Sequence, residues 1–153
     1  MLTPKQMLKH VEGRIRNMED LRKKQVKVGL IGTGTYDDGT SVLAVGAGHE
    51  FGGGTTPRRS FLRDSFEEKQ SDIDAVISSQ LLKVIDDNLK VNTALGRVGS
   101  KAVGIAKMAF RTNGYGKWVA LKPDYALVKA KTKRTQTLVM TTKLRESITW
   151  SVE

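Results

Sequence analysis

The segment at residues 26–39, VKVGLIGTGTYDDG, is the part of the chain that comes nearest to a cofactor-binding motif. An apolar, β-branched run ends in Gly32 and Gly34, but a dinucleotide fingerprint needs G-x-G-x-x-G directly before a helix, where the pyrophosphate binds. Asp37 stands where the third glycine is required, and with Asp38 it places two carboxylates where phosphates would approach. We therefore expect no nucleotide here and interpret the glycines as a loop that follows a strand.

The histidines and cysteines do not provide a catalytic or metal-binding pattern. His49-Glu50 begins the zinc-protease motif H-E-x-x-H, but no histidine stands four residues after His49, and His10 is the only other histidine. We interpret His49 as a structural side chain whose ring is hydrogen-bonded. Because the chain has no cysteine, disulfides, thiolate nucleophiles and cysteine-ligated zinc are excluded.

Serines and paired carboxylates are the remaining groups that could act as nucleophile, acid or base. Ser60, Ser65 and Ser71 do not lie in a nucleophile elbow. The carboxylate pairs are adjacent in sequence, which is typical of exposed turns and helix faces, and nothing in their pattern favours a hydrolase. They are Asp37/Asp38, Glu67/Glu68 and Asp86/Asp87. The sequence therefore predicts that the protein is not an enzyme and has no catalytic residue, metal or cofactor.

Positive charge is concentrated in the last third of the chain. The formal net charge is +10, and residues 101–153 carry eleven basic residues against three acidic ones. Residues 25–100 are nearly neutral, with eight basic residues against ten acidic ones. A basic end on a nearly neutral body indicates either a polyanionic partner or a solvated surface, and the sequence leaves both open.

Four cations form the densest basic tract, and they are Lys129, Lys131, Lys133 and Arg134. In an extended segment the three lysines would share one face and the arginine would lie on the other. One interpretation is a solvated loop. The other is that the tract contacts DNA phosphates in a channel, or an acidic partner.

The first elements that must position these groups are a long helix and a strand. Thr3, Pro4 and Gln6 form a capping box with proline at the first helical position, which predicts a helix over residues 3–24. A strand is expected at residues 25–31, followed by a turn-rich loop. The hydrophobic residues of the helix recur at helical spacing, so we expect them to form its inward face: Met7, Val11, Ile15, Met18 and Leu21.

Short elements and a glycine loop occupy the next part of the chain. Residues 41–51 suit a strand or a short helix, and we favour a helix capped by Ser41. Three glycines make residues 52–57 a loop, because glycine loses the most backbone entropy on folding. Ser60 is expected to cap a short helix that contains Phe61, Leu62 and Phe66.

Two further helices and a terminal strand complete the expected fold. The longer elements are helices from Asp72 to about Asn88 and from about Asn92 to Asn113, the second with an apolar stripe. The shorter ones are a helix from Pro123 to Lys129, a strand at 137–140, a turn at 143–146 capped by Thr141 or Thr142, and a strand at 147–152. The sum is one α+β domain, residues 1–153, with three substantial helices on a small, mainly antiparallel sheet and long glycine-rich loops.

Two blocks of the sequence, HEFG at residues 49–52 with PRRSFLR at 57–63, and GYGKW at 114–118 with TTKLRESI at 141–148, resemble the virion morphogenesis, or tail completion, family of tailed bacteriophages. The first is His49-Glu50-Phe51-Gly52, a glycine loop, and PRRSFLR at residues 57–63, which is similar to the family pattern HEFG…PPRPFLR. The second runs from the tryptophan segment at 114–118 to TTKLRESI at 141–148, where the family has T-G-x-L-R-x-S-I. Thr142 stands where the family usually has glycine.

The resemblance implies a non-enzymatic subunit, commonly six per ring, that completes a tail or joins it to the head. Its partners would be further copies of itself, neighbouring neck, connector or tail-tube proteins, and viral DNA in the channel. No apolar run approaches the ~20 residues that span a membrane, and no signal-peptide core is present. We therefore expect synthesis in the host cytoplasm and a place at the head–tail junction of the virion.

The candidate site residues are those of the two blocks and of the basic tract. We expect Phe61 and Leu62 to be buried as an anchor, with Arg58, Arg59 and Arg63 facing solvent or a neighbouring subunit. The expected interface or anchor residues are Phe51, Arg58, Arg59, Phe61, Leu62, Arg63 and Trp118. The alternative function is a small basic nucleic-acid-binding or host-interaction module, which the charge of the terminal third suggests.

Overall fold

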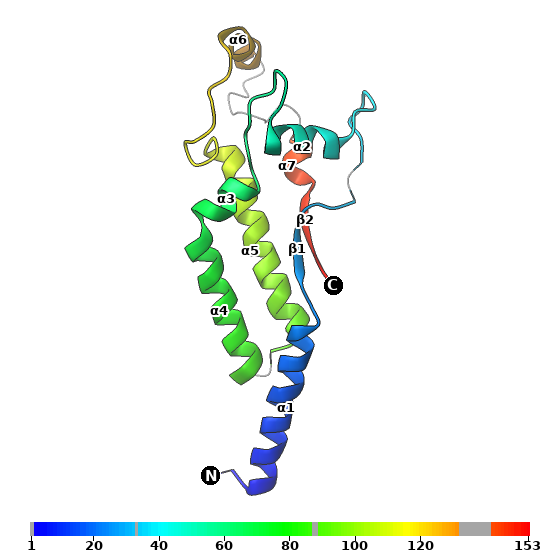
Figure 1. Cartoon of the computed structure of the whole chain (residues 1–153), viewed down its shortest axis with the longest axis vertical. Coiled ribbons are helices and arrows are strands. Elements are labelled where there is room, and N and C mark those ends of the chain that lie inside the picture. Colours follow the sequence, from blue (N-terminus) through cyan, green and yellow to red (C-terminus); the bar gives the residue numbers. More distant parts are fainter. Residues whose placement is uncertain (1, 33, 87–88, 132–141) are drawn as a thin grey trace.

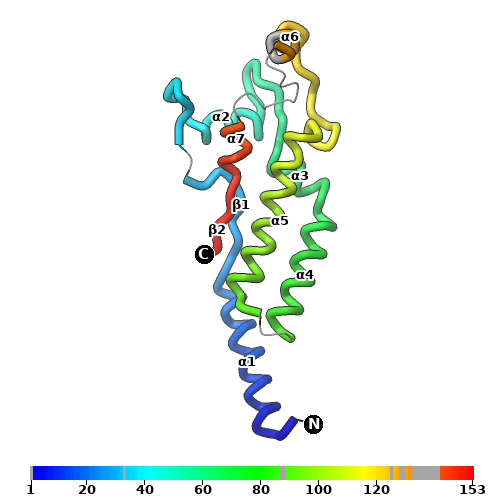
Figure 2. The backbone as a smooth tube through the Cα atoms, turned by 180° about the vertical axis from the view of Figure 1, so that it is seen from behind, coloured from blue at the N-terminus to red at the C-terminus, as the bar shows by residue number. Residues whose placement is uncertain are grey.

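The computed structural model of the chain describes residues 2–32, 34–86, 89–131 and 142–153. Its architecture is α+β, as the sequence predicts, with long helices beside a two-stranded antiparallel sheet (Figure 1). The elements are α1 (Pro4–Arg22), β1 (Val26–Leu30), α2 (Val42–Phe51), α3 (Arg63–Glu68), α4 (Gln70–Asp86), α5 (Val91–Arg111), α6 (Pro123–Lys131), α7 (Lys143–Glu146) and β2 (Ile148–Val152). α5 lies between α4 and the two strands in both views of the backbone, so it is the central element (Figures 1 and 2).

The sheet joins segments that are far apart in the sequence. β1 and β2 pair in antiparallel orientation, with Val26 opposite Val152 and Leu30 opposite Ile148. The alternation of apolar residues had predicted β2, and Ile148 is indeed only 1% exposed. Because β2 packs against α5, the sheet fixes the C-terminal segment on the central helix.

Two glycines in α5 make room for the largest side chain of the sheet. A Cβ atom on Gly96 would lie 2.9 Å from the Trp150 ring, and one on Gly99 would lie 2.7 Å from it. Real Cβ atoms do not approach a ring so closely, so only glycine fits at these positions. The packing of the Trp150 indole against α5 therefore offsets the destabilisation that glycine causes inside a helix.

The buried hydrophobic residues form two clusters along α5. The upper cluster joins α2, α5, α7, β2 and the segment before α3, and its buried members are Val42, Phe61, Ala106, Ala109, Phe110, Leu144 and Ile148. The lower cluster contains Val84, Val91 and Ala94, with Leu21 and two other partly buried leucines packed against it. The upper cluster contains Phe61 of the first block, with Trp118 of the second block packed against it, and the lower cluster holds α1 against the helices.

Several predicted helix starts are confirmed in atomic detail. The Thr3 hydroxyl accepts from the Gln6 amide while the Gln6 side chain accepts from the Thr3 amide, so the capping box is complete. The Ser41 hydroxyl accepts from the Ala44 amide and caps α2, which settles the ambiguous segment as a helix. Both helices begin where a side chain replaces the missing intrahelical acceptor.

The starts of α3 and α7 differ from the predicted helix caps. α3 begins at Arg63, after Phe61 and Leu62, and its N-cap residue is Leu62, but the Ser60 hydroxyl does accept from the Asp64 amide in the first turn, as a cap would. Thr142 stands at the N-cap of α7 without a capping bond, and its backbone is left-handed, with φ of 63°. A left-handed residue favours glycine, which is the residue that the resembling family usually has there. The predicted strand at 137–140 lies outside the described residues.

The orientation of α1 also differs from the prediction. α1 contacts the body through Arg14, Asn17 and Leu21: Arg14 pairs with Asp86 and Asn17 donates to the Val84 carbonyl. The rest of the helix extends beyond α4 and α5, away from the sheet (Figures 1 and 2). The predicted inward stripe is therefore half exposed except at Leu21: Met7, Val11, Ile15 and Met18 are each 49–50% exposed.

Candidate functional site

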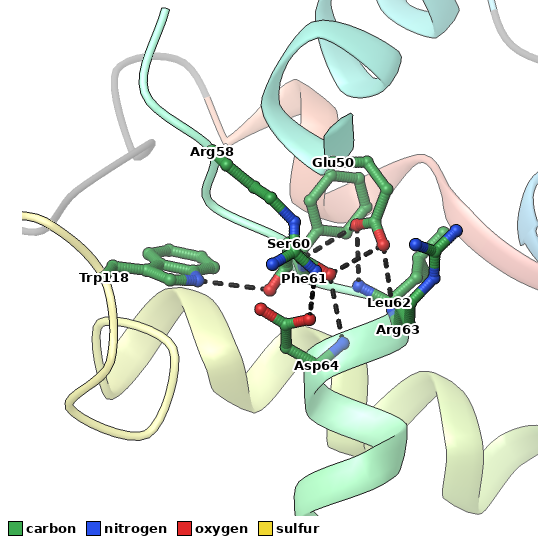
Figure 3. A network of polar contacts seen from close by, with 8 residues as sticks. All are labelled: Glu50, Arg58, Ser60, Phe61, Leu62, Arg63, Asp64 and Trp118. Atoms are coloured by element: carbon green, nitrogen blue, oxygen red, sulfur yellow. Dashed lines mark hydrogen bonds and ion pairs between the residues drawn. The ribbon is translucent and has the colours of Figure 1, made fainter. Parts of the chain in front are cut away.

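The first of the two blocks is organised around one buried carboxylate. Glu50, at the end of α2, is 8% exposed and accepts four hydrogen bonds (Figure 3). One comes from the Ser60 hydroxyl at 2.7 Å, and the others come from the backbone amides of Phe61, Leu62 and Arg63 at 2.9, 3.0 and 2.9 Å. The carboxylate thus holds the backbone that follows the glycine loop, across a gap of ten residues.

These bonds give α3 the cap that its own sequence lacks. The first amides of a helix have no intrahelical acceptor, and a negative charge near them is favourable because of the helix dipole. Glu50 supplies this acceptor from α2, while the Ser60 hydroxyl accepts from the Asp64 amide at 3.0 Å. With four donors on its two oxygens, Glu50 is a structural carboxylate and is not exposed as an acid or base.

Sequence reasoning missed Glu50 because its partners are remote. In the sequence, His49-Glu50 indicates an incomplete zinc-protease motif and the start of the first block, and neither pattern assigns hydrogen-bond donors to the carboxylate. One signal was present: Glu50 is the only acid in an otherwise apolar helix. An isolated acid among apolar residues requires donors, but the pattern does not say where they lie.

Phe61 confirms the prediction of a buried anchor. Its side chain is fully buried, and its ring lies 5.2 Å from that of Phe110, which in turn meets the Trp118 ring edge-on at 5.7 Å. The Trp118 indole also donates to the Ser60 carbonyl at 3.1 Å (Figure 3). Trp118 is therefore an internal anchor that joins the second block to the first.

A left-handed turn places this tryptophan. Gly114 follows α5 with φ of +65°, and a Cβ atom there would lie 2.2 Å from the indole of Trp118. Both the backbone conformation and the ring thus require glycine. Tyr115 next to it donates to the Ile105 carbonyl at 2.8 Å and fixes the same turn on α5.

Arg59 contradicts the prediction that all three arginines of the block face outward. It is only 6% exposed, and its Nε and Nη2 donate to the Val119 carbonyl at 3.3 and 3.1 Å. Its own amide donates to the His49 carbonyl at 2.7 Å. Arg59 is buried because it ties the segment after Trp118 to the end of α2.

His49 also departs from the prediction of a hydrogen-bonded histidine. Its Nδ1 atom is buried and has no hydrogen-bond partner within the described residues. Burial lowers the pKa of His49 below its ordinary 6.5, and the positive charge of Arg59 lowers this pKa further. The ring is therefore neutral at pH 7, where its charged form would be poorly solvated.

Three of the predicted interface residues lie on the surface of the block. Phe51 is 63% exposed, and the Arg63 guanidinium lies over its ring at 5.5 Å. The Arg58 side chain is exposed and pairs with Asp64 (Figure 3). Leu62 is half-buried beside the upper cluster. Phe51, Arg58 and Arg63 are thus accessible to a neighbour, whereas Phe61, Arg59 and Trp118 serve the interior.

A groove of about 510 Å³ lies between the two blocks. It is lined by residues 54–57 of the glycine loop, by residues 119–122 and by Arg59. Arg59 thus connects its two walls, since its guanidinium bonds to Val119 on the far side. The groove is a surface feature that both blocks build together.

The basic tract is only partly within the described residues. Lys129 and Lys131 end α6, and Lys131 is exposed, whereas Lys133 and Arg134 lie outside the described residues. The helix expected from Pro123 to Lys129 is present and continues to Lys131, so the shared face considered for an extended segment does not apply to this part of the tract.

Within the described part of the chain, no group of three or more histidines and carboxylates could hold a metal ion. Among the same residues, no helix has both the length and the apolar character needed to cross a bilayer. No protein-family model, curated protein or solved structure matches this chain.

Proposed function

We propose that this protein is a structural virion subunit of a tailed bacteriophage, which forms a ring in the neck and completes the tail or joins it to the head. One observation carries the proposal: the two blocks that resemble the tail-completion family pack on each other. Trp118 bonds to Ser60 and Arg59 bonds to Val119 across more than fifty residues of sequence. Their order and spacing therefore serve one structural unit, as a shared family pattern would.

The exposed apolar face of α1 supports assembly with further copies. Met7, Val11, Ile15 and Met18 recur at helical spacing and are each about half exposed. Covering such a side chain would stabilise an assembly by about 1 kcal/mol, since full burial is worth about 1.5–3 kcal/mol. Contiguous exposed apolar residues are typical of interaction surfaces, and closed rings bury equivalent surfaces in every subunit.

Electron microscopy of virions tests the proposed place in the particle. In the phage that encodes this chain, deletion of its gene should give tails that are unfinished or separated from full heads. Supplying the wild-type protein in trans should restore joined, infectious particles, which controls for effects on neighbouring genes. Normally joined and infectious particles without the protein would contradict the proposed function.

A further inference from the structure

α7 packs beside α5, and a cationic hollow is lined by residues of these two helices. It has a volume of about 370 Å³, and three cations line it: Lys107 and Arg111 from α5 and Arg145 from α7. Lys107 and Arg111 are four residues apart, so they project from the same side of the helix. Glu146 is the one acid that lines this hollow.

Among the described residues these three cations form no ion pair, whereas most neighbouring basic residues do. Lys117 pairs with Glu68 and Lys143 lies 4.0 Å from Asp37. In the described part of the chain, by contrast, no carboxylate lies within 4.0 Å of the Lys107, Arg111 or Arg145 side-chain nitrogens. Residues 132–141, which precede α7, contain two cations and no acid. Within the described residues, no ion pair therefore neutralises the three cations of the hollow, and Glu146 is the acid that lines it.

The hollow continues along α5 into a second depression of about 410 Å³. The two share Gly104 and Met108, and the second is also lined by Lys69 and Lys101. Gly104 has no atom within 4 Å of the position of a Cβ, so the floor between the depressions is open. Lys101, whose Nζ lies 3.9 Å from Asp72, is only weakly paired. From Lys101 to Arg111 the helix rises about 15 Å, so the cations of the two adjoining depressions are spread along nearly three turns of α5, and we call them the cationic row.

We propose that this row, centred on Lys107, Arg111 and Arg145, binds the phosphates of a nucleic-acid backbone without reading its sequence. A backbone presents a regular line of single negative charges, which fits a line of cations better than scattered carboxylates do. The planar guanidinium groups of arginine bind phosphate oxygens in a bidentate manner, and the lysine acts as a point charge. The surface belongs to the single subunit, so the inference does not depend on ring formation.

The test is binding of the full-length protein to a fluorescent 20-base-pair duplex of arbitrary sequence, measured by anisotropy between 50 and 200 mM NaCl. The variant K107Q/R111Q/R145Q removes the three charges. Each phosphate contact contributes about 0.9 to the slope of log K against log salt, so the variant should lose about 2.7 of this slope. The factor by which affinity drops between 50 and 200 mM NaCl should then be about 40 times smaller for the variant than for the wild type.

A matched variant distinguishes the effect of removing the cations of the hollow from the effect of lowering the net charge. K9Q/R16Q/R22Q removes one lysine and two arginines from exposed positions of α1, so its net charge equals that of the test variant. We expect it to keep the wild-type slope. Equal losses in both variants, no loss in either, or no binding by the wild type at 50 mM NaCl would overturn the proposal.

Two further measurements keep the test decisive. If the triple variant does not fold by circular dichroism, R111Q alone should reduce the slope by about 0.9, and an unchanged slope would overturn the proposal. Poly-glutamate is added as a competitor at the same charge concentration as unlabelled duplex. Weaker displacement by poly-glutamate supports a phosphate site, whereas equal displacement would indicate an acidic protein partner and overturn the assignment.

Discussion

Two regions of this molecule were both expected from the sequence to bury apolar side chains, but their environments in the structure are opposite. The segment after the glycine loop places Phe61 in a fully buried position beneath a carboxylate whose hydrogen bonds hold the backbone. α1 carries an apolar stripe at helical spacing, yet Ile15 and Val11 in its middle are about half exposed. The difference teaches that periodicity identifies an apolar face, while only the three-dimensional structure shows whether the same chain covers it.

The largest expected effect is on the buried anchor. Phe61→Ala should lower the free energy of unfolding by about 3–5 kcal/mol, because it removes a fully buried ring beside Phe110 and leaves a cavity. Urea denaturation monitored by circular dichroism measures the change. Phe51→Ala, at a 63% exposed position, is the control and should shift the same quantity by about 0.5 kcal/mol or less. Equal effects would show that the two phenylalanines do not differ as described.

The next effect concerns the remote cap. Glu50→Ala should destabilise the fold by about 3 kcal/mol, because three backbone amides and one hydroxyl lose their acceptor in a buried place. Glu67→Ala removes an exposed carboxylate from the neighbouring helix and should leave the free energy of unfolding nearly unchanged. A cost below about 1 kcal/mol for Glu50→Ala would mean that water replaces the carboxylate.

Alanine substitutions at two glycines of α5 should have smaller effects on the free energy of unfolding, and these effects should have opposite signs. Gly99→Ala should destabilise by about 1–2 kcal/mol, because the new methyl group would lie 2.7 Å from the Trp150 ring. Gly104→Ala meets no atom within 4 Å and should stabilise by about 0.5–1 kcal/mol through helix propensity. Thermal melts of both variants give the comparison, and the same sign of shift would refute the packing argument.

The smallest effect is a pH dependence caused by His49. Its pKa is lowered in the folded state, so the unfolded state binds the proton more readily. Stability from this group is therefore fully present above pH 6.5 and falls as the pH decreases from 6.5 towards the folded pKa. His49→Gln should flatten the stability curve in this window, whereas His10→Gln, at an exposed position, should not. Identical slopes in wild type and His49→Gln would contradict the assignment.

Local signals in the sequence were sufficient for the α+β class and for several element starts. The capping box of Thr3 and Gln6 and the cap of Ser41 involve residues three apart, so the sequence pattern contains both partners. The anchor Phe61 was also predictable, because an aromatic residue among arginines has few other roles. These features depend on neighbours along the chain.

The features that could not be predicted depend on partners far away in the sequence. The donors of Glu50 lie beyond the glycine loop, and the acceptor of Arg59 is the Val119 carbonyl. Gly99 is required by Trp150, about fifty residues later. The exposure of α1 could not be predicted either, because an apolar stripe does not state whether its own chain or another one covers it.

The mass of the full-length protein in solution, measured by light scattering after gel filtration, tests the proposed assembly most directly. The wild type should form a closed ring of several subunits, with a mass that is a multiple of the 16.9 kDa chain. The variant Met7→Gln/Val11→Gln/Ile15→Gln should have the mass of a single chain. Its melting temperature should match that of monomeric wild type, because α1 contacts its own body through other residues. A wild type that remains monomeric at micromolar concentrations, with the variant indistinguishable from it, would contradict the account.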